Sequence, residues 1–266
     1  KITVKSKSLF VFDSNKKEIS ILEAQSFNGT IDVSNMKIKS LEGIEAFVKL
    51  TKLICSGNKL TNLDLSKNLA LEFLDCKNNA IEQLNISQNQ LLKEVKIYNN
   101  RISNIDLTGN INLVHLSARN NPLKTLNITK NLKLQSIYCQ NTQISELDVR
   151  KNKYLIWLYC ADNLLQELDV SENKELVELA CSNNKLNNLL LNENTSLVFL
   201  DCQNNQLTKL DLRNNLKVTT LYSKGNVGLT ICVLESQLNH RWYRDINPFN
   251  EEDKIRTNEI QTNCKD

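Results

Sequence analysis

The chain has 266 residues and a formal net charge of +3, from 33 Lys and Arg against 30 Asp and Glu. These charges are interspersed, which predicts a solvated surface and gives no case for a nucleic-acid partner. No apolar run is long enough to insert into a membrane. The first residue is Lys1 rather than Met, so we expect a processed or trimmed chain.

Residues 1–49 precede a regular repeat that begins at Leu50 and are predicted to form an N-terminal cap with an entry repeat. Apolar positions within 31–47 change from strand-like to short helical spacing: Ile31, Val33, Ile38, Leu41, Ile44 and Phe47. We expect three aromatic residues to cover the edge of the first repeat: Phe10, Phe12 and Phe27.

A calcium loop is suggested weakly within this cap by Asp13, Asn15 and Glu23. Lys17 stands where a third oxygen ligand is needed, and Glu18 stands where the turn needs Gly. We therefore predict a degenerate cap loop and no metal.

Residues 50–228 repeat every 21 residues without insertion or deletion, in the pattern LxxLxCxxNxLxxLxLxxN of a leucine-rich repeat. Leu53 and Cys55 are two residues apart, as are Leu63 and Leu65, so each repeat predicts two short strands with one buried face. We call them the Cys half-strand and the second half-strand. One turn cannot bury such a face alone, so the turns must stack as a solenoid.

Two series of asparagines mark the predicted bends of each turn. The first series is Asn58, Asn79, Asn100, Asn121, Asn163, Asn184, Asn205 and Asn226, with Thr142 as its exception. The second is Asn68, Asn89, Asn110, Asn131, Asn152, Asn173, Asn194 and Asn215. We predict that the first series is a ladder of amides that satisfies backbone groups. Because the chain has only six Gly, Asn is expected to make many of the left-handed turns.

The cysteines fall into two groups. Six occupy the repeat: Cys55, Cys76, Cys139, Cys160, Cys181 and Cys202. These are predicted to be free and buried, because neighbouring rungs lie about 4.8 Å apart and disulfide Cβ atoms about 3.8 Å apart. Cys232 and Cys264 lie off the series. We predict that they pair, rather than remain free thiols, and so clip residues 233–263 over the solenoid end. The pairing would define a C-terminal cap at 229–266 and an oxidising compartment.

The repeat LDCxxNxLxxLDxSxN, the entry TIDVSNMKIKSLEGIEAF and the exit NVGLTICV with the late Cys264 resemble secreted bacterial leucine-rich-repeat proteins. The resemblance is to the cysteine-ladder internalins and to related surface proteins of Gram-negative bacteria, over nearly the whole chain. It implies a horseshoe or arc, with the Cys half-strands in a parallel sheet on the concave side. Short extended or 3-10 segments would form the convex side, with little helix outside the caps. It also implies a secreted or cell-surface binding or adhesion module without a catalytic set.

Aromatic residues are concentrated on the outward-facing positions of the Cys half-strands. Seven of these 27 positions are aromatic, whereas the 24 matching positions on the second half-strand hold none. Strand propensity alone would enrich both half-strands, so the asymmetry predicts a binding face. The predicted ligand-binding residues are Phe73, Tyr98, His115, Arg119, Tyr138, Trp157, Tyr159, Phe199 and Tyr222. The predicted charged rim is Asp75, Glu94 and Lys96.

Adjacent rungs would place Tyr138 beside Tyr159, with Trp157 flanking the pair, at the centre of this face. They would also place Tyr98 beside Arg119 as a cation–π pair.

The predicted function is a non-catalytic, monomeric extracellular module that recognises a protein partner. The alternatives are a glycan-binding module and a structural spacer of a larger surface protein. An enzyme is disfavoured because His115 has no triad partner at a suitable spacing, and the other histidine, His240, lies in the C-terminal cap. Lys96 is expected to pair with Asp75, which argues against a catalytic pair of Asp75 and Glu94. No phosphate, metal or cofactor motif is present.

Overall fold

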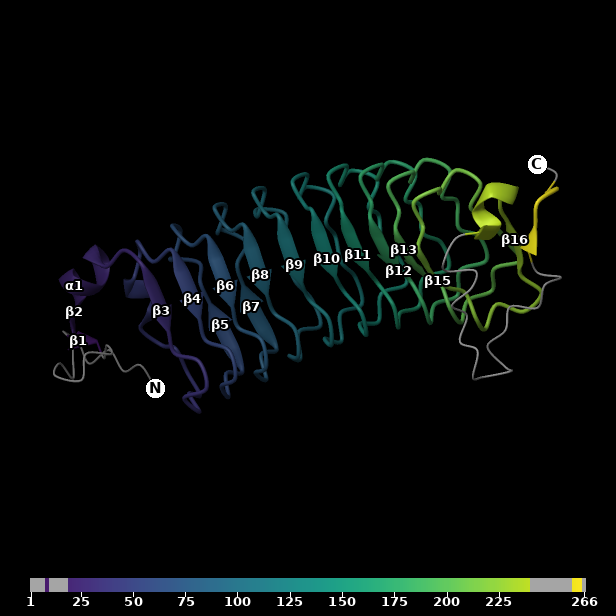
Figure 1. The fold of residues 1–266 in the computed structure, drawn as a ribbon. Coiled ribbons are helices and arrows are strands. Elements are labelled where there is room, and N and C mark those ends of the chain that lie inside the picture. The colour runs from purple at the N-terminus through teal and green to yellow at the C-terminus, as the bar shows by residue number, and fades with distance from the viewer. Residues whose placement is uncertain (1–7, 10–18, 240–259, 265–266) are drawn as a thin grey trace. The chain divides into compact units, whose positions relative to one another are not determined.

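The predicted leucine-rich-repeat solenoid of parallel strands is confirmed by the computed structural model, which describes residues 8–9, 19–239 and 260–264. The chain divides into two compact units, Lys1–Lys133 and Leu134–Asp266. Both consist of stacked turns with short strands (Figure 1). In the described part of the chain, no helix has the length and apolar character needed to cross a bilayer.

The first unit begins with short elements at the N-terminal side: β1 (Ser8–Leu9), β2 (Ile19–Ser20), α1 (Ile21–Ser26) and the 3-10 helix η1 (Ile44–Ala46). A capping box starts α1, because Ser20 Oγ accepts from the Glu23 amide while the Glu23 carboxylate accepts from the Ser20 amide. Phe27 packs edge-on against Phe47, with 5.8 Å between ring centroids. Phe10, Phe12, Asp13 and Asn15 lie outside the described residues.

The Cys half-strands of the first unit form a parallel sheet in the order β3 (Thr30–Asp32), β4 (Lys52–Ile54), β6 (Phe73–Asp75), β8 (Glu94–Lys96) and β9 (His115–Ser117). The second half-strand contributes a parallel pair of β5 (Asn62–Asp64) and β7 (Gln83–Asn85). β3 thus supplies a rung before the first regular repeat.

The second unit is built from the same kind of turn. Its sheet of Cys half-strands runs in the order β10 (Ser136–Tyr138), β11 (Trp157–Tyr159), β12 (Glu178–Ala180), β13 (Phe199–Asp201) and β15 (Thr220–Tyr222). A further parallel sheet comprises β14 (Lys209–Asp211), β16 (Thr230–Cys232) and β17 (Ile260–Gln261), and η2 (Glu235–Asn239) follows β16.

The core of each unit is a stack of the repeated apolar side chains. Leu53 lies opposite Leu74 in the first unit, and Leu158 lies opposite Leu179 in the second. The six cysteines on the repeat are free and buried, as predicted. Burial raises the pKa of the Cys202 thiol to about 12, so the ladder is a set of inert, protonated thiols.

The first asparagine series forms the predicted amide ladder. Asn100 Nδ2 donates to the carbonyl oxygens of Cys76 and Ile97 at 3.0 and 2.9 Å, and its Oδ1 accepts from the Ile81 amide at 3.0 Å. At the exception, Thr142 Oγ1 lies 3.1 Å from the Cys139 carbonyl oxygen. Each amide therefore joins its own turn to the preceding one, which satisfies backbone groups that the bend removes from the sheet.

The left-handed turns lie one residue before this ladder. Positive φ values from 50° to 67° recur there at Gly57, Asn78, Asn99, Asn120, Asn141, Asp162, Asn183 and Asn204. Their exposed side chains form a third ladder, in which Asn99 Nδ2 donates to Asn78 Oδ1 at 2.6 Å. Asparagine makes these turns, as expected, but the residues that turn are distinct from those whose amides satisfy the backbone.

The second asparagine series is also an amide ladder and is completely buried. Asn89 Nδ2 donates to the carbonyl oxygens of Leu65 and Asn68 at 3.0 and 2.8 Å. In the second unit, Asn194 makes the equivalent bonds to Val170 and Asn173, both at 2.9 Å. The two ladders hold the two bends of the turns, and at Thr142 a hydroxyl group takes the place of the first amide.

Candidate functional site

The outward-facing rows of the Cys half-strands carry the aromatic residues in both units. We call the rows of the first unit the first face: Lys52, Ile54, Ser56, Phe73, Asp75, Lys77, Glu94, Lys96, Tyr98, His115, Ser117 and Arg119. The rows of the second unit are the second face: Ser136, Tyr138, Gln140, Trp157, Tyr159, Ala161, Glu178, Ala180, Ser182, Phe199, Asp201, Gln203, Thr220, Tyr222 and Lys224. Alternation along each strand explains why these side chains point away from the buried Leu and Cys.

The aromatic rings of the first face are covered by cations of the same chain. Phe73 has the Lys52 ammonium 4.3 Å and the Lys96 ammonium 5.1 Å from its ring centroid. Tyr98 has the Arg119 guanidinium 4.1 Å from its ring centroid, so the contact predicted for this pair is present. Lys77 also approaches the Tyr98 ring, at 5.6 Å.

The carboxylates of the first face are paired with lysines. Asp75 forms an ion pair with Lys77 at 3.0 Å, and Glu94 forms one with Lys96 at 2.6 Å. The expected pairing of Asp75 with Lys96 was therefore wrong: Lys77 lies on the same face two residues along the chain, and Lys96 is held by Glu94. Hydrogen bonding to Asp75 raises the pKa of Lys77 above its ordinary value. Asp75 is only 6% exposed, so it lies beneath its neighbours instead of on an accessible rim.

The rings of the second face pack against one another. Tyr138 and Tyr159 are stacked, with centroids 5.1 Å apart and an interplanar angle of 22°. Phe199 and Tyr222 meet edge-on at 5.9 Å. Trp157 is half-buried on β11, two residues from Tyr159 and on the same face. The predicted tyrosine pair is thus present, and Tyr222 is the most exposed of these rings, at 49%.

The carboxylates of the second face bind neutral donors. The Tyr159 hydroxyl donates to Glu178 Oε2. Burial, together with this carboxylate, raises the pKa of Tyr159 above its ordinary value, so the hydroxyl remains a proton donor at neutral pH. Asp201 Oδ2 accepts from Ser182 Oγ at 2.8 Å, and Asp201 Oδ1 accepts from the Gln203 side-chain amide at 3.2 Å.

Neither carboxylate has a basic partner among the ion pairs of the described residues. Sequence reasoning did not single out Glu178 or Asp201. The available signal was the absence of a lysine two residues along the same strand, where Lys77 and Lys96 stand on the first face.

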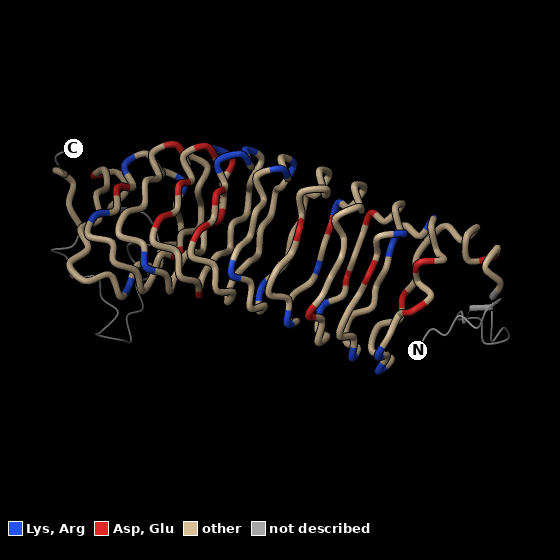
Figure 2. The backbone as a smooth tube through the Cα atoms, turned by 180° about the vertical axis from the view of Figure 1, so that it is seen from behind, with Lys and Arg blue, Asp and Glu red and all other residues tan. Residues whose placement is uncertain are grey.

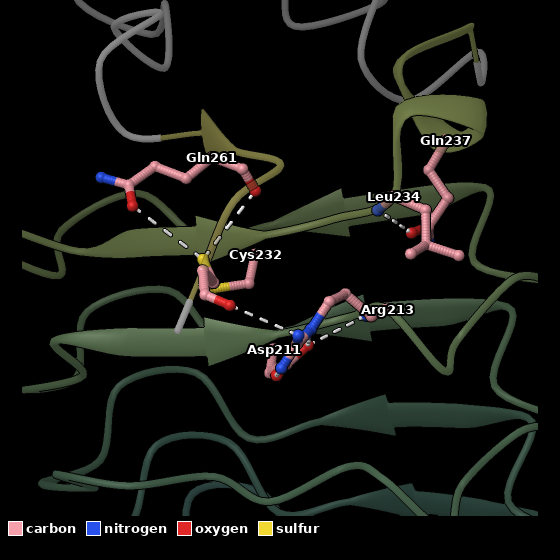
Figure 3. The surroundings of a disulfide bond; sticks show 7 residues. Asp211, Arg213, Cys232, Leu234, Gln237 and Gln261 are labelled. Carbon is pink, nitrogen blue, oxygen red and sulfur yellow. Dashed lines mark hydrogen bonds and ion pairs between the residues drawn. A yellow bond between two sulfur atoms is a disulfide. The ribbon is translucent and has the colours of Figure 1, made fainter. Parts of the chain in front are cut away.

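Cys232 and Cys264 form a disulfide, with their Cα atoms 5.8 Å apart (Figure 3). Arg213 and Asp211 form an ion pair at 2.6 Å beside it, and Arg213 Nη1 donates to the Cys264 carbonyl oxygen at 3.4 Å. Gln237 Nε2 donates to the Leu212 carbonyl oxygen at 2.9 Å. These bonds fasten η2 and β17 to the last turns. The remaining C-terminal residues, from His240 to residue 259, lie outside the described residues.

Basic and acidic residues are interspersed along the turns of each unit (Figure 2). Within the described ranges, no group of three or more His, Cys, Asp or Glu side chains is arranged to hold a metal ion.

No protein-family model and no curated protein sequence matches this chain. Solved structures do match. The functional domain of InlJ from Listeria monocytogenes, which includes a cysteine ladder, is 26% identical and aligns over 85% of this chain and 58% of its own, with a TM-score of 0.58. The chain therefore spans little more than half of that structure.

Two further structures show the fold alone. Internalin C2 from Listeria monocytogenes is 20% identical over 69% of this chain and 84% of its own, with a TM-score of 0.63. The Toll–Spätzle complex of Drosophila is 22% identical over 82% of this chain and 33% of that chain, with a TM-score of 0.64. The chain is therefore a leucine-rich-repeat solenoid with a cysteine ladder in 21-residue turns, and its fold is similar to that of internalins.

Proposed function

We propose that this chain is a non-catalytic extracellular module that binds a protein partner through the aromatic side chains of its outward-facing rows. The observation that carries the proposal is the difference between the two half-strands. The rings occupy only the Cys half-strands, and Tyr138, Trp157, Tyr159 and Phe199 are all partly accessible there. A rigid aromatic side chain buries a large area at low entropic cost when a partner docks, which makes such positions typical interface anchors.

The protein class of partner is supported by the fold and by the spread of the rings. Aromatic residues of the second face occur on four strands, β10, β11, β13 and β15, so contact requires an extended partner surface. One of the similar chains belongs to the Toll–Spätzle complex, an assembly of proteins. An extracellular location is supported by the Cys232–Cys264 disulfide, because such bonds persist in oxidising compartments.

The test is a pull-down from host extracellular and bacterial-surface material, read by mass spectrometry. The intact chain is compared with a Tyr138→Ala, Trp157→Ala, Tyr159→Ala variant. The matched control is Glu146→Ala, Glu167→Ala, Asn188→Ala, which removes exposed side chains from the second half-strand of the same unit. Circular dichroism establishes that both variants fold.

We expect one protein to be retained by the intact chain and the control and lost by the aromatic variant. Equal recoveries from all three chains would contradict the proposal and favour the spacer alternative.

The glycan alternative is favoured by one observation, the stacked Tyr138–Tyr159 pair, which offers a flat platform to a sugar ring. Release of the captured material by free oligosaccharide would support that alternative.

A further inference from the structure

The two faces differ in what neutralises their charges. On the first face, the basic residues outnumber the carboxylates: Lys52, Lys77, Lys96 and Arg119 stand against Asp75 and Glu94. Every one of these cations contacts a ring, and both carboxylates are ion-paired. On the second face the carboxylates outnumber the basic residues, since it has Glu178 and Asp201 but only Lys224.

The two carboxylates of the second face lie next to its rings in the register of the sheet. Glu178 on β12 is the direct neighbour of Trp157 on β11 and of Phe199 on β13. Asp201 is the direct neighbour of Tyr222 on β15. Neighbouring rungs are about 4.8 Å apart. A cation bound at either carboxylate would therefore lie within about 6 Å of a ring, the range of a cation–π contact.

The described residues do not supply that cation. No Lys or Arg side chain lies over Trp157, Tyr159, Phe199 or Tyr222 in this part of the chain, whereas cations cover both rings of the first face. Glu178 and Asp201 are half-buried rather than covered, so a partner can reach them. On the first face, carboxylates and rings are both in contact with lysines and an arginine of the same unit. The second face has the carboxylates and the rings without those cations.

We propose that the second face docks a basic segment of the partner protein, whose Lys or Arg side chains pair with Glu178 and Asp201 and lie over the adjoining rings. This inference rests on the proposed function and specifies the chemistry of the partner. Charge complementarity selects the occupant, since a neutral glycan would leave both carboxylates without a counter-charge. Arginine fits best, because its planar guanidinium both stacks on aromatic rings and pairs with carboxylates.

The experiment follows Trp157 directly with synthetic peptides. The chain has two tryptophans, so 5-fluorotryptophan labelling gives two fluorine NMR signals, and Trp157→Phe identifies that of Trp157. The probes are (Gly-Ser-Arg)₄, (Gly-Ser-Lys)₄, (Gly-Ser-Glu)₄ and the neutral sugar maltohexaose. We expect the arginine and lysine peptides to shift the Trp157 signal and the glutamate peptide and the sugar to leave it unmoved. The shift should weaken as salt is raised from 0.05 to 0.5 M, because screening shortens the reach of the charges.

Isosteric neutralisation separates charge from shape. Glu178→Gln with Asp201→Asn keeps the hydrogen bonds to Tyr159 and Ser182 available and removes both charges. We expect the dissociation constant of the arginine peptide to rise about tenfold in this variant. The matched control is Glu146→Gln with Glu167→Gln, which removes two negative charges from exposed positions on the second half-strand of the same unit. It should change the constant by less than twofold.

Three outcomes would overturn the inference: no movement of the Trp157 signal with either basic peptide at millimolar concentration, equal movement with the glutamate peptide, or equal affinity in the neutralised variant. Movement with maltohexaose alone would also overturn it, in favour of a glycan.

The pull-down separates the two proposals. A partner lost by the Tyr138, Trp157, Tyr159 variant but retained by the neutralised variant would leave the proposed function standing and refute the basic partner.

Discussion

The first and second faces share one backbone turn and differ in how their side chains are satisfied. Phe73 and Tyr98 are each covered by two cations of their own unit. The rings of the second face contact each other, and its carboxylates accept hydrogen bonds from neutral groups. A repeat therefore dictates where side chains point, while the residue chosen at each rung decides whether the surface is neutralised internally or left for a partner.

The largest expected effect is the loss of stability when the Cys232–Cys264 disulfide is removed. Among the described residues, only the second unit contains a disulfide. Cys264→Ser opens the disulfide that joins residues separated by 32 positions. We expect this to lower the free energy of unfolding of the second unit by about 3.5 kcal/mol, because the unfolded chain regains loop entropy. Hydrogen exchange should quicken in β14 and β16. The amides of β4 and β6 in the same sample are the control, and an equal change there would contradict the assignment of this effect to one unit.

The next prediction compares how much the buried amide ladder stabilises each of the two units. Asn100→Ala and Asn184→Ala remove equivalent ladder amides from the first and second units, each bonded to buried backbone groups. We expect each to lower the free energy of unfolding by about 2 to 3 kcal/mol, since buried carbonyl and amide groups lose their partners. Urea denaturation measures the change.

The controls for this pair are Asn99→Gly and Asn183→Gly. They preserve the left-handed backbone at φ values of 56° and 53° and remove only exposed amide bonds. Each should change stability by less than about 0.5 kcal/mol. Unequal losses for the two buried ladder variants would show that the units differ in more than surface chemistry.

A smaller effect should distinguish the rings of the two faces. Tyr98→Ala removes a ring that Lys77 and Arg119 already cover. We expect stability to fall by about 1 kcal/mol, from the lost cation–π contacts, while affinity for the captured partner changes less than twofold. Trp157→Ala should instead weaken binding by about tenfold or more, as for an interface anchor. Titration of the purified partner measures both, and comparable losses of affinity would refute the functional difference between the faces.

The smallest expected effect is a change in stability at high pH, caused by the ionisation of Tyr159. Its folded-state pKa is raised by burial first and by Glu178 second. Its contribution to stability is therefore fully present below pH 10 and is lost as the pH rises above 10, since the folded state holds the proton more tightly. Phenolate absorbance should show a late-titrating tyrosine that Tyr159→Phe removes. Glu178→Gln should move it toward the ordinary value, and an unchanged titration would exclude the carboxylate as a cause.

Much of this arrangement could be predicted from spacing. The repeat placed Cys55 and its equivalents in the core and the first asparagine series at a bend, and the structure agrees. It also brought Tyr138 to Tyr159 and Tyr98 to Arg119, because equivalent positions on adjacent rungs must be neighbours. The pairing of Asp75 could not be read this way, because long side chains choose among several partners within reach. Lys77 and Lys96 both lie near Asp75 in the register, and only their conformations decided between them.

The sequence by itself determined the turn, its period and the rows that face solvent, because these follow from periodicities of hydrophobic and amide groups that recur with every copy. Tertiary structure decided the properties that depend on side-chain conformation and on burial by neighbouring residues. It placed Asp75 beneath its neighbours and directed the Tyr159 hydroxyl to Glu178. Periodicity specifies which positions are neighbours, whereas the reach of each side chain determines which neighbours interact.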